Sequence, residues 1–341
     1  MQNWPQSHIF TVTHTANFAK PLLVGGNNDK TEIMIKRAIL IFLICSLSNF
    51  TYSQIDLNSE EFNLLINWKK DARFQYSNSY NKIIVSNSDT LTNELTQFNT
   101  EIYVADESDS GYKVHWKLHK ITTDSKKFSW VQLMNLCMGM NFELNVSKDS
   151  GLIEITNVRS LQKELENRFI KNLVELGELD RVDGEEFRTL IQNVVTSEEA
   201  FKTIIAGHIS VYFKFHGFKF SPKKSIETVI QTKTAMSDNS IDTWSRVYLG
   251  EIDSLNESFE IHSEEKLNST QLSSIYKSYY LQKYSLSELP ESVESDLANI
   301  LSNKVANFTF NNNGTVMEGN YSDILKMPKT TRIELFLIEL K

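Results

Sequence analysis

The feature that most constrains the fold of this chain is a strict alternation of apolar and polar residues from Tyr112 to His119. Successive side chains of a β-strand point to opposite faces of a sheet, so this alternation predicts a strand with one buried face. A polar turn at 106–111 precedes it, and residues 101–105 supply a partner strand, which together indicate a hairpin. Weaker strand candidates lie upstream, at 73–76, 82–86 and 91–98.

Helical spacing replaces this alternation in the middle of the chain. Apolar residues recur every three or four positions over 158–176, which predicts an amphipathic helix. A second helix is predicted after the Asp183-Gly184 break. Thr196-Ser197-Glu198-Glu199 is typical of a capping box, so it predicts the start of a third helix.

Strand character returns after Pro222 and continues to the last residues. Helical spacing interrupts it at 272–280 and again after Pro290, a residue that favours the first turn of a helix. The segment 332–340 is apolar at nearly every position, which predicts a terminal strand buried on both faces.

An internal duplication is the other structural signal. Residues 141–163 contain Asn-Phe-Glu-Leu, a glycine and an asparagine-led segment, and residues 307–326 repeat that order. The separation from Gly151 to Asn157 equals that from Gly314 to Asn320. Coincidence in an Asn- and Ser-rich chain is the alternative interpretation.

We therefore predict an α+β fold dominated by antiparallel sheet, built from two related β-rich units that pack together. The first unit covers 54–157, a helical insert covers 158–215, and the second unit covers 216–341.

Residues 34–53 resemble a secretory signal peptide. Lys36 and Arg37 precede an apolar stretch of about ten residues, and Thr51-Tyr52-Ser53 offers small residues ahead of a cut before Gln54. A bilayer-spanning helix needs roughly 20 apolar residues, so no transmembrane helix is predicted in the mature chain. Residues 1–33 are then expected to be a non-native leader upstream of the natural start.

Charge and cysteine content narrow the partners and the compartment. A formal net charge of −8 without a block of Lys or Arg argues against a nucleic-acid partner. Lipid attachment at Cys45 is disfavoured because the bulky Ile44 precedes it. Cleavage before Gln54 leaves Cys137 alone in the apolar run 130–140, where core packing is favoured over a reactive thiol.

No catalytic, metal-binding or cofactor-binding residue is predicted. His115 and His119 lie four positions apart on a strand, about 13 Å, which is too far for one zinc ion. His208 and His216 are expected to be buried core histidines. No phosphate-binding glycine loop or Gly-x-Ser-x-Gly motif is present, and acidic pairs such as Glu264-Glu265 are explained by solvation. A carboxylate pair assembled by folding would still permit an enzyme.

One aromatic cluster is the candidate ligand pocket. Aromatic rings offer stiff, flat contact surfaces for an apolar or sugar ligand, although the same rings also suit the core where the third helix meets the sheet. The cluster comprises Tyr212, Phe213, Phe215, Phe218 and Phe220.

The strand order, the glycine hairpin with its following asparagine and the Ser53-Gln54 cut site together resemble a group of uncharacterised exported β-rich proteins of Gram-negative, Bacteroidota-type bacteria. That group carries no known activity. The resemblance implies a protein of the periplasm, outer-membrane surface or extracellular space. We expect it to bind a small molecule, lipid, glycan or envelope protein in a concavity between its sheets, without a cofactor. The alternatives are a hydrolase of envelope polymers and a structural envelope component.

Overall fold

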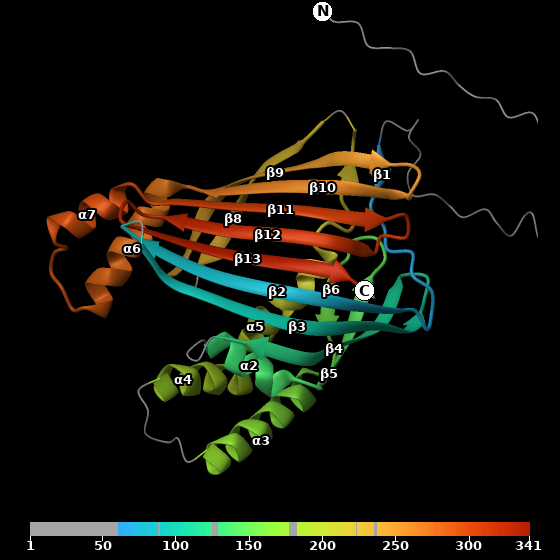
Figure 1. The fold of residues 1–341 in the computed structure, drawn as a ribbon, viewed down its shortest axis with the longest axis horizontal. Helices are drawn as coiled ribbons and strands as arrows, with labels where there is room; N and C mark the ends of the chain where they lie inside the picture. Colours follow the sequence, from blue (N-terminus) through green and yellow to red (C-terminus); the bar gives the residue numbers. More distant parts are fainter. Residues whose placement is uncertain (1–60, 88, 125–128, 177–182, 223, 235–236) are drawn as a thin grey trace, which may run out of the picture. The chain divides into compact units, whose positions relative to one another are not determined.

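Eleven antiparallel strands form one continuous sheet in the computed structural model, which describes residues 61–87, 89–124, 129–176, 183–222, 224–234 and 237–341 (Figure 1). The strand order across the sheet is β6-β5-β4-β3-β2-β13-β12-β11-β10-β9-β8. Neighbouring strands also follow one another along the chain except at one place, where β2 pairs with β13.

The strands of this sheet vary widely in length. They are β2 (Arg73–Ser86), β3 (Asp89–Glu107), β4 (Gly111–Thr123), β5 (Asn141–Ser147), β6 (Ile153–Ile155), β8 (Ile226–Thr234), β9 (Ser237–Asp253), β10 (Ser258–Leu267), β11 (Leu301–Asn311), β12 (Val316–Lys326) and β13 (Thr330–Leu340). β1 (Phe62–Asn63) and β7 (Lys219–Phe220) pair separately. The predicted hairpin is confirmed as β3–β4, where Ile102 lies opposite Trp116.

The helices lie largely where their spacing predicts them. They are α2 (Ser129–Cys137), α3 (Val158–Leu176), α4 (Asp183–Thr196), α5 (Glu198–Ile209), the 3-10 helix η1 (Ser210–Phe213), α6 (Ser269–Lys283) and α7 (Glu291–Ala298). The fold is therefore α+β with a mainly antiparallel sheet, as predicted. The capping box is a correction, because Ser197 rather than Thr196 caps α5 by accepting a hydrogen bond from the Ala200 amide.

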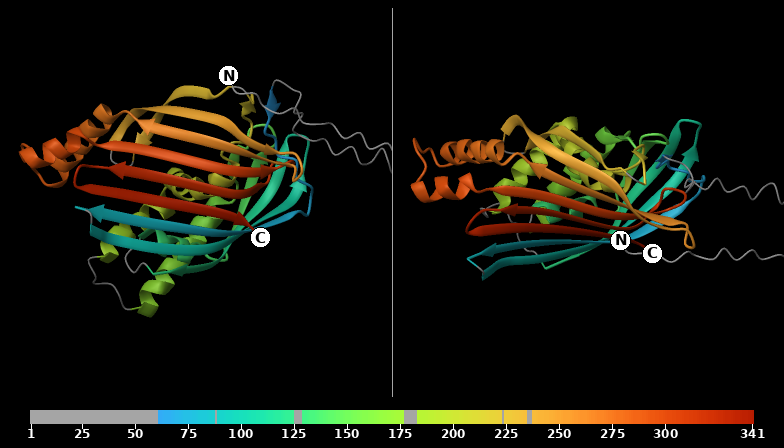
Figure 2. Two further views of the ribbon diagram at one scale, coloured as in Figure 1. Left: turned by 45° about the horizontal axis from the view of Figure 1, so that its top comes forward. Right: turned by 90° about the horizontal axis from the view of Figure 1, so that it is seen from above.

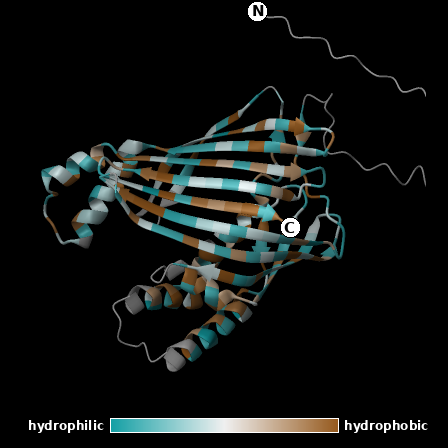
Figure 3. Ribbon diagram, viewed as in Figure 1, coloured by the Kyte–Doolittle hydropathy of each residue, from teal (hydrophilic) through white to brown (hydrophobic). Residues whose placement is uncertain are grey.

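Helices α2–α5 and η1 pack against one face of the sheet, which we call the inner face, while α6 and α7 lie at one end of the sheet (Figures 1 and 2). Alternation along the strands, visible as changing colour in Figure 3, supplies the apolar side chains of this face. Tyr212 connects η1 to the sheet, because its hydroxyl bonds Asn78 of β2 at 2.7 Å and Thr100 of β3 at 2.9 Å.

One end of the inner face is covered by the segment 62–68, and we call this the closed end. Backbone amides of that segment bond two turns that are distant in sequence: Ile66 N donates to Lys148 O at 3.3 Å, and Asn67 N donates to Asn313 O at 2.9 Å. The Trp68 indole donates to Thr315 at 2.9 Å. These bonds join the β5–β6 turn and the β11–β12 turn through a single stretch of chain.

Both turns contain a glycine with positive φ, +60° at Gly151 and +79° at Gly314. A Cβ at Gly151 would lie 2.5 Å from the His216 Cβ, and one at Gly314 would lie 2.3 Å from the Leu65 carbonyl oxygen. Any other residue would therefore clash as well as strain the backbone. His216 lies between the two turns and donates from Nε2 to the Gly314 carbonyl at 2.7 Å.

The two predicted β-rich units contribute five and six strands to the one large sheet, so the concavity lies on a single sheet and not between two sheets. The hairpins of both units turn at glycine, but their continuations differ. Asn157 immediately precedes α3, whereas Asn320 lies inside β12. The internal duplication stays a prediction.

The predicted burial of the terminal strand on both faces is wrong. Ile338 of β13 is buried on the inner face, but its neighbour Leu337 is 46% exposed. The physical reason is that no second layer covers the outer face of β13 among the residues the structure describes.

The signal peptide, its cut site and Cys45 lie outside the described residues. Among the helices of the described residues, none combines the length and the hydropathy that a membrane-spanning helix needs.

Candidate functional site

Two rows of inner-face residues lie between the closed end and helices α6–α7. Pairing of adjacent strands places Tyr80, Phe336 and Tyr321 side by side, and we call these three the aromatic row. The next inward position on each strand is charged. This charged row crosses six neighbouring strands and consists of Glu94, Lys82, Glu334, Asp323, Lys304 and Glu265.

A cleft of about 630 Å³ opens over the aromatic row. Helix α5 and η1 form its other wall, with Ile204, Val211 and the exposed face of Gly207. His208, Ser210 and Lys214 add polar groups from the same wall, and Glu334 adds one from the sheet. The cleft is therefore apolar at its centre and polar where it meets the charged row.

Each charge next to the cleft has an opposite charge nearby. Lys214 Nζ lies 3.1 Å from a Glu265 carboxylate oxygen and 5.3 Å from the centre of the Tyr321 ring. Lys304 lies 4.0 Å from Asp323, and Arg332 lies 3.4 Å from Glu334. Charged side chains that face a helix-covered sheet are costly to desolvate unless they are paired, and these pairs reduce that cost.

Burial changes the acidity of groups in both rows. Burial, reinforced by the Glu334 carboxylate, raises the pKa of the Tyr80 hydroxyl far above its ordinary value, so the hydroxyl stays protonated and hydrogen-bonds Glu334. Burial and then Asp323 raise the pKa of Tyr321 similarly. Burial also raises the pKa of Asp323, against the opposing effect of Lys304. Desolvation lowers the pKa of His208 to about 4, which leaves the imidazole neutral at pH 7.

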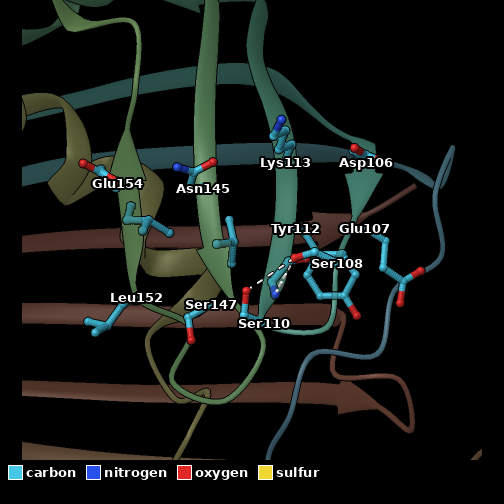
Figure 4. Close-up of a pocket in the computed structure, with 13 residues that line it drawn as sticks. Asp106, Glu107, Ser108, Ser110, Tyr112, Lys113, Asn145, Ser147, Leu152 and Glu154 are labelled. Carbon is cyan, nitrogen blue, oxygen red and sulfur yellow. Dashed lines mark hydrogen bonds between the residues drawn. The ribbon is translucent and has the colours of Figure 1, made fainter.

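A second hollow of about 450 Å³ lies at the tip of the β3–β4 hairpin beside β5 and β6 (Figure 4). Its hydrogen bonds, such as Ser108 Oγ to the Gly111 carbonyl at 3.0 Å, close the hairpin turn. Lys148 and Glu107 neutralise each other at 2.8 Å. The hollow is smaller than the inner-face cleft and contains exposed charges, so we consider the inner-face cleft the better candidate site.

The sequence-predicted aromatic cluster lies beside this cleft without lining it. Tyr212, Phe213, Phe215 and Phe220 are buried in the core, whereas Phe218 is 36% exposed. Phe215 packs edge-on against Phe308 at a centroid distance of 5.4 Å, within the core of the closed end. Contact of this cluster with a ligand stays a prediction, and its observed role is packing.

The other residues considered from the sequence are placed as follows. His115 lies on β4 in edge-on contact with Tyr103, and no group of three or more metal-ligating side chains occurs in the described part of the chain. His216 is buried, and its pKa falls to about 4 because burial disfavours the charged form. Cys137 is buried on α2, and burial raises the pKa of its thiol to about 12.

The residues of the cleft were missed by the sequence analysis because four distant segments supply them. One signal was available: several strands carry a charged residue at a position where alternation expects an inward-facing side chain. Lys304 and Asp323 are examples, and such a break in pattern often marks a functional position.

Comparisons with known proteins give no family. No protein-family model and no curated protein matches the chain. Among solved structures, lipovitellin, from a study of its lipid–protein interactions, is similar over 80% of this chain and 25% of its own, with 8% identity and a TM-score of 0.38. An outer membrane channel from Pseudomonas putida F1 aligns with 84% of this chain and 100% of its own, with 5% identity and a TM-score of 0.15. The chain thus spans a quarter of the length of the lipovitellin chain.

Proposed function

We propose that this protein binds a small amphipathic molecule in the cleft between α5–η1 and the inner face of the sheet, without catalysing a reaction on it. The observation that supports this proposal is the adjacency of the aromatic row and the charged row at the cleft. An apolar chain would contact Tyr80, Phe336 and Val211, and a polar group would meet Lys214 or Glu334.

The size and chemistry of the cleft support a ligand of this kind. Pockets for small molecules commonly enclose roughly 300–1,000 Å³, with apolar walls and a few polar groups that fix orientation. The cleft volume of about 630 Å³ falls in that range. A purely structural envelope component is less well supported, because a scaffold would need no such hollow beside the core.

The test is titration with an anthroyloxy-labelled long-chain fatty acid, followed by its fluorescence. Gly207→Phe is the blocking variant, because Gly207 lines the cleft and a Cβ built there meets no atom within 4 Å. Its control is Lys202→Phe, which adds the same ring to an exposed position of α5 that lies outside the cleft.

Saturable binding is expected for the wild type and for Lys202→Phe. A loss of at least tenfold, about 1.4 kcal/mol, is expected for Gly207→Phe because the ring occupies the space of the ligand. Equal affinity of the two variants would place the probe elsewhere and contradict the proposal. Mass spectrometry of an organic extract of the natively purified protein would then identify the natural ligand.

Export to the envelope is part of the same proposal, and the signal-like segment 34–53 supports it. The mature protein would begin at Gln54 in the periplasm, at the outer-membrane surface or outside the cell. Mass spectrometry of the N-terminus in an envelope fraction tests this directly. An intact chain recovered only from the cytosol would contradict it.

A hydrolase acting on envelope polymers is a second candidate, favoured by one observation. Asp323 and Glu334 are directly opposite each other on adjacent strands, and the pKa of Asp323 is raised by burial. Two neighbouring carboxyl groups, one of them with a raised pKa, are the arrangement used in glycoside hydrolysis. Release of sugars from purified peptidoglycan, abolished by Asp323→Asn, would establish this activity. If the protein binds a ligand without catalysis, neither the wild type nor Asp323→Asn should release sugars.

A further inference from the structure

The two edges of the large sheet differ in how they are protected. β6 is three residues long and continues almost directly into α3. β8 is nine residues long and pairs only with β9, which leaves its other side open. An open edge exposes a row of backbone amides and carbonyls that can pair with another strand, and proteins usually shorten, charge or cover such edges.

β8 has exposed apolar and β-branched side chains that suit strand pairing. Val229 is 64% exposed and Ile230 is 41% exposed, although they point to opposite faces of the sheet. Thr228 and Thr232 are also β-branched, and no proline interrupts the strand. A strand added alongside β8 would contact both faces of this edge at once.

The sequence of β8 is complementary to itself when it is read outward from Ile230. In antiparallel pairing of two copies about that residue, Thr228 lies opposite Thr232, and Val229 lies opposite Gln231. Glu227 lies opposite position 233, which is a lysine in the sequence. Opposite charges and paired threonines are both favourable directly across two antiparallel strands.

We propose that β8 is a self-association edge, at which two copies of this chain pair antiparallel about Ile230 and join their sheets. The two-fold axis passes through Ile230, so each copy presents the same surface to the other. In the single chain the Glu227 carboxylate already lies 3.5 Å from Arg246 of β9.

Charged substitutions of Ile230 test this arrangement. Because the two-fold axis passes through that residue, residue 230 of one copy faces residue 230 of the other. The mature protein is expected to sediment at twice the monomer mass at micromolar concentrations. Ile230→Lys and Ile230→Glu each place like charges together, and each is expected to sediment as a monomer. An equimolar mixture of the two is expected to recover the double mass, because lysine then faces glutamate.

Leu255→Lys is the control, since Leu255 is 94% exposed in the β9–β10 turn and far in sequence from β8. It is expected to keep the wild-type mass. Circular dichroism of the two Ile230 variants would show that each still folds. A wild type that sediments as a monomer at all concentrations, an unchanged mass for both Ile230 variants, or a mixture that stays monomeric would each overturn the proposal.

Discussion

The two ends of the inner face differ in how completely the space above the sheet is filled. At the closed end, the segment 62–68 and rings such as Phe215 and Phe310 fill the space, and backbone bonds join two distant turns. Toward α6 and α7, the same strands carry charged side chains and leave a cleft under α5. The sheet is continuous through both regions.

This difference separates the residues expected to stabilise the fold from those expected to contact a ligand. Residues of the closed end contribute mainly buried apolar area, which stabilises in proportion to the area removed from water. Residues of the cleft leave apolar area exposed and hold paired charges, which contribute little net stability. Substitutions at the closed end should therefore affect unfolding, and substitutions at the cleft should affect binding.

The largest effect is expected from Phe215→Ala, which removes a fully buried ring at the closed end. We expect the free energy of unfolding to fall by about 3–5 kcal/mol, as for other buried aromatic residues. Phe336→Ala, at the cleft, should cost about 1–2 kcal/mol because that ring is only half-buried. Urea titration measures both. Equal costs would remove the distinction between the two regions.

The second expected effect is a loss of folding stability at low pH, caused by His216. Burial places its folded-state pKa at about 4, below the ordinary 6.5 that it recovers on unfolding, so the unfolded chain binds the proton more tightly. Stability is therefore lost as pH falls from about 6.5 toward 4. The loss from this group should reach about 2 kcal/mol at pH 5.

His216→Gln keeps an amide that can donate to Gly314 and should remove that part of the pH dependence. Urea midpoints at pH 7.5 and pH 5 give the comparison. An identical pH dependence in His216→Gln and the wild type would show that other groups cause the loss.

A third, smaller effect is expected for the lysine–glutamate pair at the cleft. Lys214 and Glu265 lie 3.1 Å apart with largely covered side chains. A double-mutant cycle with Lys214→Met and Glu265→Gln should give a coupling energy of about 1 kcal/mol. The matched exposed pair is Lys70 and Asp106, 3.3 Å apart, for which a smaller coupling is expected because water screens it. Equal coupling would show that the cleft is as well solvated as the surface.

The smallest expected effect concerns the blocking variant. Glycine inside a helix is unfavourable by about 1 kcal/mol relative to alanine, and phenylalanine recovers part of that difference. Gly207→Phe should therefore unfold at a slightly higher urea concentration than the wild type, even though its cleft is filled. Destabilisation beyond about 1 kcal/mol would mean that the cleft collapses around the glycine and is not an open site.

Local pattern predicted the elements well because each depends on neighbouring residues. The helix 158–176 and the hairpin at 101–118 follow from periodicity alone. The long strands were seen only in pieces, because the polar residues Ser77, Ser79 and Asn81 of β2 lie on the uncovered outer face and weaken its signal. The pairing of β2 with β13 depends on residues about 250 positions apart, and no local pattern reports such contacts.

The same limit explains why the sequence did not predict the residues of the candidate site. Tyr80 and Phe336 are register partners, yet nothing near either residue in the sequence indicates the other. The aromatic cluster at 212–220 was conspicuous because its members are adjacent in sequence, and adjacency of that kind is typical of a packed junction. Residues that form a cleft are instead assembled by topology.

The pairing of β2 with β13 also has a kinetic consequence. Eleven residue pairs, from Ser86–Thr330 to Tyr76–Leu340, join the sheet at its middle. Closing so long a loop costs conformational entropy before any contact forms, so this one pairing should form more slowly than the sequential hairpins. The sheet cannot be completed until the last strand has been synthesised. Until then, β2 and β12 are each left with one unpaired edge in the middle of the sheet.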